Sequence, residues 1–94
     1  MTNDQSLKQA IDGMLKAFHL DAKMHEVKLI SSWETVMGKT VANRTTKIFI
    51  RDKKLFVYLN SASLREELHR ERQKIINLLN TEAGIDVIEE IIFS

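Results

Sequence analysis

The sequence predicts a small α+β domain in which helices cover a three-stranded sheet, in the element order α-α-β-β-α-β. Two observations support this class. Apolar residues recur at the helical period of about 3.6 before residue 38 and after residue 63. In residues 46–59, apolar and polar residues instead alternate with the period of 2 that is typical of strands, and residues 87–93 are rich in valine and isoleucine. A chain of 94 residues has the size of one domain with one core, so we expect a single domain over residues 1–94.

The first helix is expected over about residues 6–19. Ser6, followed three residues later by Gln9, forms a capping box at its start, and Gly13 lowers the stability of its interior by about 1 kcal/mol relative to alanine. Six apolar residues at helical spacing predict the buried stripe of this helix: Leu7, Ala10, Ile11, Met14, Leu15 and Phe18.

The second helix is expected from Ala22 to Met37. Asp21 is a suitable N-cap, and Gly38 stands where a helix-ending residue with positive φ belongs. Trp33 is interpreted as a core anchor because a large aromatic ring at a helical core position buries much apolar area. The other residues predicted to be buried on this helix are Val27, Ile30, Val36 and Met37.

A β-hairpin is expected around Asp52 and Lys53. The apolar period changes to 2 from Thr46 onward, and Asp-Lys is a weaker turn signal than Asn-Gly. The loop is therefore either two or four residues long, and both lengths place one set of apolar residues on the core side. That set comprises Ile48, Ile50, Leu55, Val57 and Leu59.

A third helix from Ser63 to Asn80 and a last strand from Val87 to Phe93 complete the predicted domain, with Gly84 in the turn between them. Ser63 to Glu66 fits a capping box, and the predicted buried stripe is Leu64, Leu68, Ile75, Ile76 and Leu79. Basic and acidic residues are interleaved along this helix, which favours a solvated face with mixed pairs. The basic members are Arg65, Arg70, Arg72 and Lys74.

Positive charge is concentrated in the middle of the chain. Residues 39–54 hold six basic residues and one acidic residue, whereas residues 82–94 hold four acidic residues and no basic one. If the apolar side of the hairpin faces the core, its other side presents cations and aromatic rings. A two-residue loop would pair these residues across the strands as Arg51 with Lys54, Phe49 with Phe56, and Lys47 with Tyr58.

Cations interleaved with aromatic rings suit a single-stranded nucleic acid, because the rings stack on bases and the cations meet phosphates. The alternative is that Phe49 and Phe56 are a cross-strand packing pair, covered by the first helix or by a second subunit. Covering Lys47, Arg51 and Lys54 in that way would require acidic partners. Both interpretations are open on the sequence alone.

No catalytic or metal-binding constellation is found, and no cofactor is expected. The chain has no cysteine, Gly38-Lys39-Thr40 lacks the earlier glycine of a phosphate-binding loop, and His25-Glu26 has Leu29 where a zinc signature needs a second histidine. The apolar runs are far shorter than the roughly 18 residues of a membrane span. The polar start of the chain lacks the pattern of a secretory signal, so we expect a cytoplasmic, non-enzymatic domain.

Three segments in order resemble one family. Val27 to Gly38 is similar to a helix of the family whose last positions are, in order, a tryptophan, two further residues, two aliphatic residues and a glycine. Leu55 to Leu68 is similar to its strand, serine-led turn and Glu-Leu helix. The pattern is completed by Asn77 to Asn80 and by Ile88 to Phe93, and the similar region covers about residues 22–93. On these residues the chain resembles the DciA-type family, formerly a domain of unknown function.

This resemblance implies a fold like the KH domain and a role at the bacterial replicative helicase of the DnaB type, with binding to nucleic acid. Two features depart from the family: longer relatives carry a basic, disordered extension, and Thr45-Thr46 stands near the place of the usual proline at the first strand. None of the three glycines can form the GxxG loop by which KH domains grip RNA, so RNA clamping of that type is not implied.

We therefore expect an adaptor that binds single-stranded nucleic acid, DNA in preference to RNA, and assists helicase loading. One alternative is a protein-interaction module, in which the same surface docks the helicase or a second copy of the chain; another is an RNA-binding role. The residues expected to contact nucleic acid are Lys39, Arg44, Lys47, Phe49, Arg51, Lys53, Lys54, Phe56, Tyr58 and Arg65.

Overall fold

The computed structural model describes residues 4–94, and for Asp4, Gln5, Asp12 and residues 15–20 it describes the backbone alone. The α+β class is confirmed: helices precede and follow the strands of a single three-stranded sheet. The elements are α1 (Asp4–Ser31), α2 (Trp33–Met37), α3 (Lys39–Arg44), β1 (Thr45–Arg51), β2 (Lys54–Leu59), α4 (Ala62–Arg70), α5 (Arg72–Ala83) and β3 (Glu90–Phe93).

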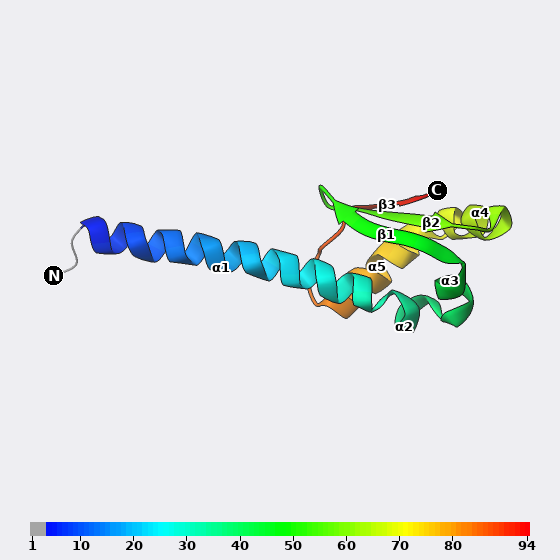
Figure 1. Cartoon of the computed structure of the whole chain (residues 1–94), viewed down its shortest axis with the longest axis horizontal. Coiled ribbons are helices and arrows are strands. Elements are labelled where there is room, and N and C mark those ends of the chain that lie inside the picture. The colour runs from blue at the N-terminus through cyan, green and yellow to red at the C-terminus, as the bar shows by residue number, and fades with distance from the viewer. Residues whose placement is uncertain (1–3) are drawn as a thin grey trace.

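The sheet has the strand order β1-β2-β3 (Figure 1). β1 and β2 pair antiparallel through the hairpin, whereas β2 and β3 pair parallel. A parallel pair requires a crossover connection, which α4 and α5 provide. The helical elements α2, α3 and α5 and the end of α1 lie on one side of the sheet, and within residues 4–94 no helix covers its other side (Figure 1).

The core lies between the sheet and these helices. The predicted alternation in the hairpin is confirmed, because Leu55, Val57 and Leu59 are buried while Ile48 and Ile50 are half-buried and pack against the core. Trp33 is buried as expected, with 4% of its surface exposed. The remaining buried apolar residues come from the helices, from β3 and from the segment before it: Leu29, Val41, Leu68, Ile75, Ile76, Leu79, Ala83, Ile88 and Ile91.

The first part of the chain differs from the prediction, since α1 is one continuous helix of 28 residues rather than two helices separated near residue 20. Ser6 and Asp21 lie inside it, so the prediction that they cap helices was wrong. The predicted burial of its stripe is also wrong for Leu7, Ala10, Ile11 and Met14, which are exposed; Leu15 and Phe18 fall among the side chains that are not described. A helix of this length spans about 42 Å, and its first part extends beyond the sheet (Figure 1).

The range of the predicted second helix, Ala22 to Met37, is divided between the end of α1 and the short helix α2. Ser32 interrupts it, and its hydroxyl donates to the carbonyl of Leu29 at 2.7 Å. Gly38 has φ 89° and separates α2 from α3, a helix that the prediction missed. Val27 is exposed rather than buried, because it lies on the side of α1 that faces away from the core.

The predicted third helix is divided at Glu71 into α4 and α5. Its N-cap is Ser61, whose side chain accepts a hydrogen bond from the amide of Leu64 at 3.3 Å, so the predicted capping box at Ser63 was wrong by two residues. α5 continues three residues past the predicted end and stops at Gly84, which adopts the left-handed conformation (φ 83°) expected of a helix-ending glycine. β3 is shorter than predicted.

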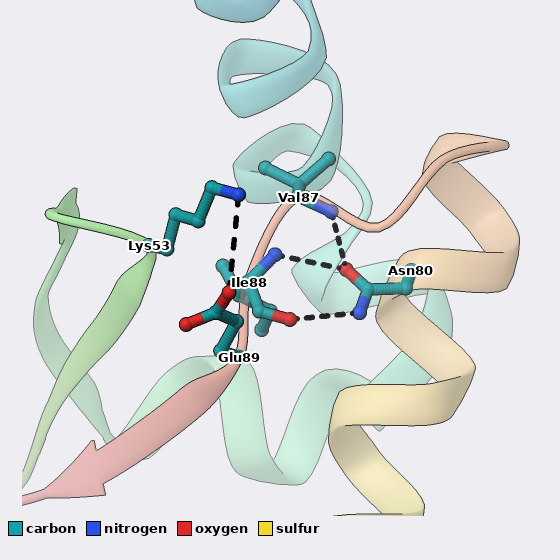
Figure 2. Close-up of polar contacts among 5 residues, drawn as sticks. All are labelled: Lys53, Asn80, Val87, Ile88 and Glu89. Carbon is teal, nitrogen blue, oxygen red and sulfur yellow. Dashed lines mark hydrogen bonds and ion pairs between the residues drawn. The ribbon is translucent and has the colours of Figure 1, made fainter.

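Asn80 explains why β3 starts only at Glu90. This buried side chain accepts hydrogen bonds from the amides of Val87 (2.9 Å) and Ile88 (3.1 Å) and donates to the carbonyl of Ile88 at 2.9 Å (Figure 2). Val87 and Ile88 therefore form these hydrogen bonds with α5 instead of with β2, whereas the amide of Glu89 donates to the carbonyl of Lys53 at 2.8 Å. Farther along, Glu89 forms an ion pair with Lys53 at 3.8 Å, so the hairpin turn holds the same segment from the other side (Figure 2).

Candidate nucleic-acid interface

The hairpin turn consists of two residues, Asp52 and Lys53, both with positive φ (51° and 60°). Two consecutive residues of this kind are typical of a type I′ turn, whose twist matches that of the flanking strands. The three cross-strand pairs expected of a two-residue loop are therefore confirmed: Arg51 lies opposite Lys54, Phe49 opposite Phe56, and Lys47 opposite Tyr58.

A bulge at Thr46 sets which residues of β1 face away from the core. Thr45 pairs with Leu59 and Lys47 with Tyr58, so one extra residue on β1 separates these pairs. Without it, Thr45 and Lys47 would lie on the same side of the sheet. The bulge allows Thr45 to turn inward while Lys47 turns outward.

The side of the sheet opposite the core, here called the outer face, is organised in rows across the strands. The register places Arg51, Lys54 and Glu90 in the first row. The second row is apolar and consists of Phe49, Phe56 and Ile92, and the third holds Lys47 and Tyr58. On β1, a cation thus stands on each side of the aromatic row.

The rings of the outer face pack against one another. The Phe49 ring lies 4.9 Å from the Phe56 ring at an interplanar angle of 11°, and 6.2 Å from the Tyr58 ring at 22°. The Lys47 ammonium lies over both Phe49 (5.2 Å) and Tyr58 (5.7 Å), within the range of a cation–π interaction. Phe49 and Phe56 are half-buried, whereas Tyr58 keeps 36% of its surface exposed.

This geometry settles the open question about the two phenylalanines in part. They are a cross-strand packing pair, stacked on each other, with Lys47 and Tyr58 against the Phe49 ring. No helix of the described residues lies over this side of the sheet, so the expected cover by the first helix is wrong (Figure 1). Cover by a second subunit stays a prediction. Tyr58 is the ring with the most surface available to a partner.

The cations near the turn are not equivalent. Lys54 forms an ion pair with Glu90 at 3.7 Å, and Lys53 forms one with Glu89. Lys47 and Arg51 have no acidic partner among the residues that the structure describes, and both are exposed. Two of the basic residues of the outer face are therefore available to an external anion.

The other three candidate cations lie outside the outer face. Lys39 begins α3, and Arg44 ends it, directly before β1. Arg65, in the first turns of α4, is half-buried, and its guanidinium donates to the carbonyl of Leu59 at 3.0 Å, which ties α4 to the end of β2. The structure thus brings together Lys47, Phe49, Arg51, Lys54, Phe56 and Tyr58, with Lys53 at the adjoining turn, but not Lys39, Arg44 and Arg65.

Sequence reasoning missed the contribution of β3 to this surface. Glu90 and Ile92 face outward because Ile91 between them is buried in the core. The residues of β2 that lie beside Glu90 and Ile92 could not be identified from the sequence, because the register between β2 and β3 depends on how the two crossover helices pack. The concentration of acidic residues in 82–94 was the available signal that one side of the surface is negative.

Two other kinds of feature, a metal-binding cluster and a membrane-spanning helix, were sought among the described residues. Within them, no three histidine, aspartate or glutamate side chains are grouped closely enough to hold a metal ion. The search for membrane-spanning helices, made on the same residues, finds none that is sufficiently long and apolar.

Comparison with known proteins identifies the family. The family model described as "Dna[CI] antecedent, DciA" matches residues 6–93. A "UPF0232 protein" of Corynebacterium glutamicum (strain R) is 30% identical over 61 residues, which are 65% of this chain and 34% of that protein, so the match spans about a third of the relative. No solved structure gives a significant match. Because the family model covers nearly the whole chain, the chain belongs to the DciA family, a family of helicase loaders or adaptors rather than of known catalysts.

Proposed function

We propose that this chain is a non-enzymatic adaptor that binds single-stranded DNA on its outer face and assists the loading of a DnaB-type replicative helicase. The helicase role is supported by membership of the DciA family, which is linked in general to replicative helicase loading. The preference for DNA over RNA follows from the same link, because a replicative helicase acts on DNA.

The observation that carries the nucleic-acid part is the position of the two cations without acidic partners. Lys47 and Arg51 stand on either side of Phe49 on one strand, and Tyr58 offers its exposed ring beside them. Four residues of extended strand separate the two cations by about 13 Å, which lets both contact one strand's backbone. Stacking of a base on an aromatic side chain contributes roughly 1–3 kcal/mol without sequence preference.

This arrangement predicts weak binding with a shallow dependence on salt. Two phosphate contacts on a single strand give a slope of about −1.4 in log affinity against log salt. Raising the salt from about 50 to about 200 mM should then weaken binding about sevenfold. A much steeper slope would mean that many more cations take part than the outer face offers.

The test is a fluorescence-anisotropy titration of labelled single-stranded DNA, duplex DNA and RNA at those two salt concentrations. The K47Q/R51Q variant should lose both single-strand binding and its salt dependence, and adding K54Q should cause no further loss. The matched control is K23Q/K28Q, which removes the same charge from exposed lysines of α1. Equal affinity of K47Q/R51Q and the control would overturn the assignment of this face.

The helicase part has its own test. Loading of a DnaB-type helicase onto circular single-stranded DNA should increase when the chain is added and should not increase with K47Q/R51Q. No stimulation by the wild-type chain would overturn the helicase role while leaving the single-strand binding intact.

A second candidate function is protein docking at the same face, and one observation favours it. Ile92 extends the aromatic row across β3, so Phe49, Phe56 and Ile92 form an apolar row across all three strands, with a cation on each side of it on β1. Aromatic and basic residues in such an arrangement are typical anchors of protein interfaces. Folded protein that binds none of the three nucleic acids but binds the helicase, or a second copy of the chain in light scattering, would favour this function.

A further inference from the structure

The first row of the outer face carries an acidic residue where the rest of the face is basic. Arg51, Lys54 and Glu90 lie side by side on the three strands in that order. The Lys54 ammonium and the Glu90 carboxylate are 3.7 Å apart, with 49% and 60% of their side-chain surface exposed. Glu89, the residue before Glu90, in turn pairs with Lys53 of the turn. The β3 side of the face is therefore the acidic side.

An intramolecular carboxylate at this distance competes with any external anion for the lysine. A phosphate that contacted Lys54 would approach Glu90 to within a few ångströms, well inside the screening length of about 8 Å at physiological salt. Arg51, one strand farther away, has no such acidic partner among the described residues. The affinity of the face for phosphate thus falls from β1 toward β3.

We propose that Glu90 closes the β3 side of the outer face to phosphate by occupying Lys54, so that the backbone of the bound strand runs along β1 past Lys47 and Arg51. The bases then point across the sheet toward Tyr58 and Phe56. This inference rests on the proposed function and adds a substrate preference to it. A duplex is wider than one row of cations and would bring its second backbone toward the acidic side, so the face selects a single strand.

The test is a cycle of the variants E90Q, K54Q and E90Q/K54Q, titrated with labelled oligo-dT over a range of salt. E90Q should bind more tightly, and the slope of log affinity against log salt should become steeper by about 0.7, because Lys54 is released as a third phosphate contact. The loss between about 50 and 200 mM salt should accordingly rise from about sevenfold to about eighteenfold. K54Q should bind like the wild type, and E90Q/K54Q should have the wild-type slope.

E82Q is the matched control, because it makes the same change in net charge at an exposed residue of α5. Melting temperatures should show that every variant folds, since exposed ion pairs contribute little to stability. E90Q should also bind duplex DNA more tightly than the wild type does.

The outcomes separate this inference from the proposed function. If neither the wild type nor E90Q binds any nucleic acid, the proposed function fails. If the wild type binds but E90Q changes affinity no more than E82Q does, the role of Glu90 is overturned and the binding face stands. If E90Q/K54Q keeps the full gain of E90Q, Lys54 is not the residue that Glu90 occupies, and the inference is again overturned.

Discussion

The indole nitrogen of Trp33 donates a hydrogen bond to the hydroxyl of Thr45 at 3.0 Å, and that hydroxyl donates in turn to the carbonyl of Val41 at 2.8 Å. Thr45, the first residue of β1, is thus joined to both α2 and α3. Because Thr45 must face inward to do so, Lys47 can face outward only if the strand carries the bulge at Thr46. The position of a candidate phosphate contact is set by a hydrogen bond in the core.

Thr45→Val should destabilise the domain. The substitution keeps the shape of the side chain but leaves the N–H of the buried Trp33 without its acceptor, which costs about 1–3 kcal/mol. Urea denaturation followed by Trp33 fluorescence measures this loss. Thr46→Val is the control, since its hydroxyl makes an exposed hydrogen bond to the Tyr58 carbonyl at 3.3 Å, and its effect should stay within about 0.5 kcal/mol. Equal effects of the two variants would contradict this account.

Asn80→Leu should be among the most damaging single substitutions in the described chain. It removes three hydrogen bonds and leaves the amides of Val87 and Ile88 without acceptors, with an expected loss of at least about 2 kcal/mol. The measurement is the free energy of unfolding. Asn77→Leu, at an exposed position one turn earlier on α5, should cost less than half as much. One ordinary hydrogen bond contributes about 1 kcal/mol. A loss smaller than this for Asn80→Leu would show that the three hydrogen bonds of the Asn80 side chain contribute little to stability.

Lys53→Gly should raise stability and leave nucleic-acid affinity unchanged. Lys53 has φ 60°, a conformation that costs a residue with a side chain about 1 kcal/mol and costs glycine almost nothing. Its ammonium is paired with Glu89, so its removal takes away no available cation. The paired measurements are melting temperature and anisotropy at low salt. A clear loss of affinity would place Lys53 among the phosphate contacts after all.

Tyr58→Ala should weaken single-strand binding by about 1–3 kcal/mol, the contribution of one stacked base. Tyr58→Phe keeps the ring and should bind like the wild type, which separates stacking from any role of the hydroxyl. Both variants should be checked for thermal stability, because Tyr58 also packs on Phe49. Equal binding of the alanine and phenylalanine variants would show that no base stacks there.

The hairpin and its outer face could be predicted from the sequence because they depend on local features. The alternation on both sides of Asp52 fixes which residues share a face, and a two-residue turn fixes their partners. The core role of Trp33 followed in the same way from its place on an apolar helical stripe.

The rest depends on contacts between distant segments. Nothing near Ser32 or Glu71 distinguishes a broken helix from a continuous one, since no glycine or proline stands at either break. The predicted burial of the apolar stripe on α1 was wrong for a different reason. Apolar residues at helical spacing indicate an amphipathic helix, but they do not show whether another part of this chain packs against it. Glu90 could not be placed beside Lys54 without the parallel register of β2 and β3.

The parallel pairing of β2 with β3 also determines the order in which the surface can be assembled. The hairpin closes over two residues and can form within microseconds, whereas β3 must wait for α4 and α5 before it reaches β2. During synthesis on the ribosome, the basic strands therefore exist before the acidic strand that balances them. A nascent chain that has emerged only as far as α5 would carry its cations unmasked, and would associate with polyanions such as ribosomal RNA more readily than the finished domain does.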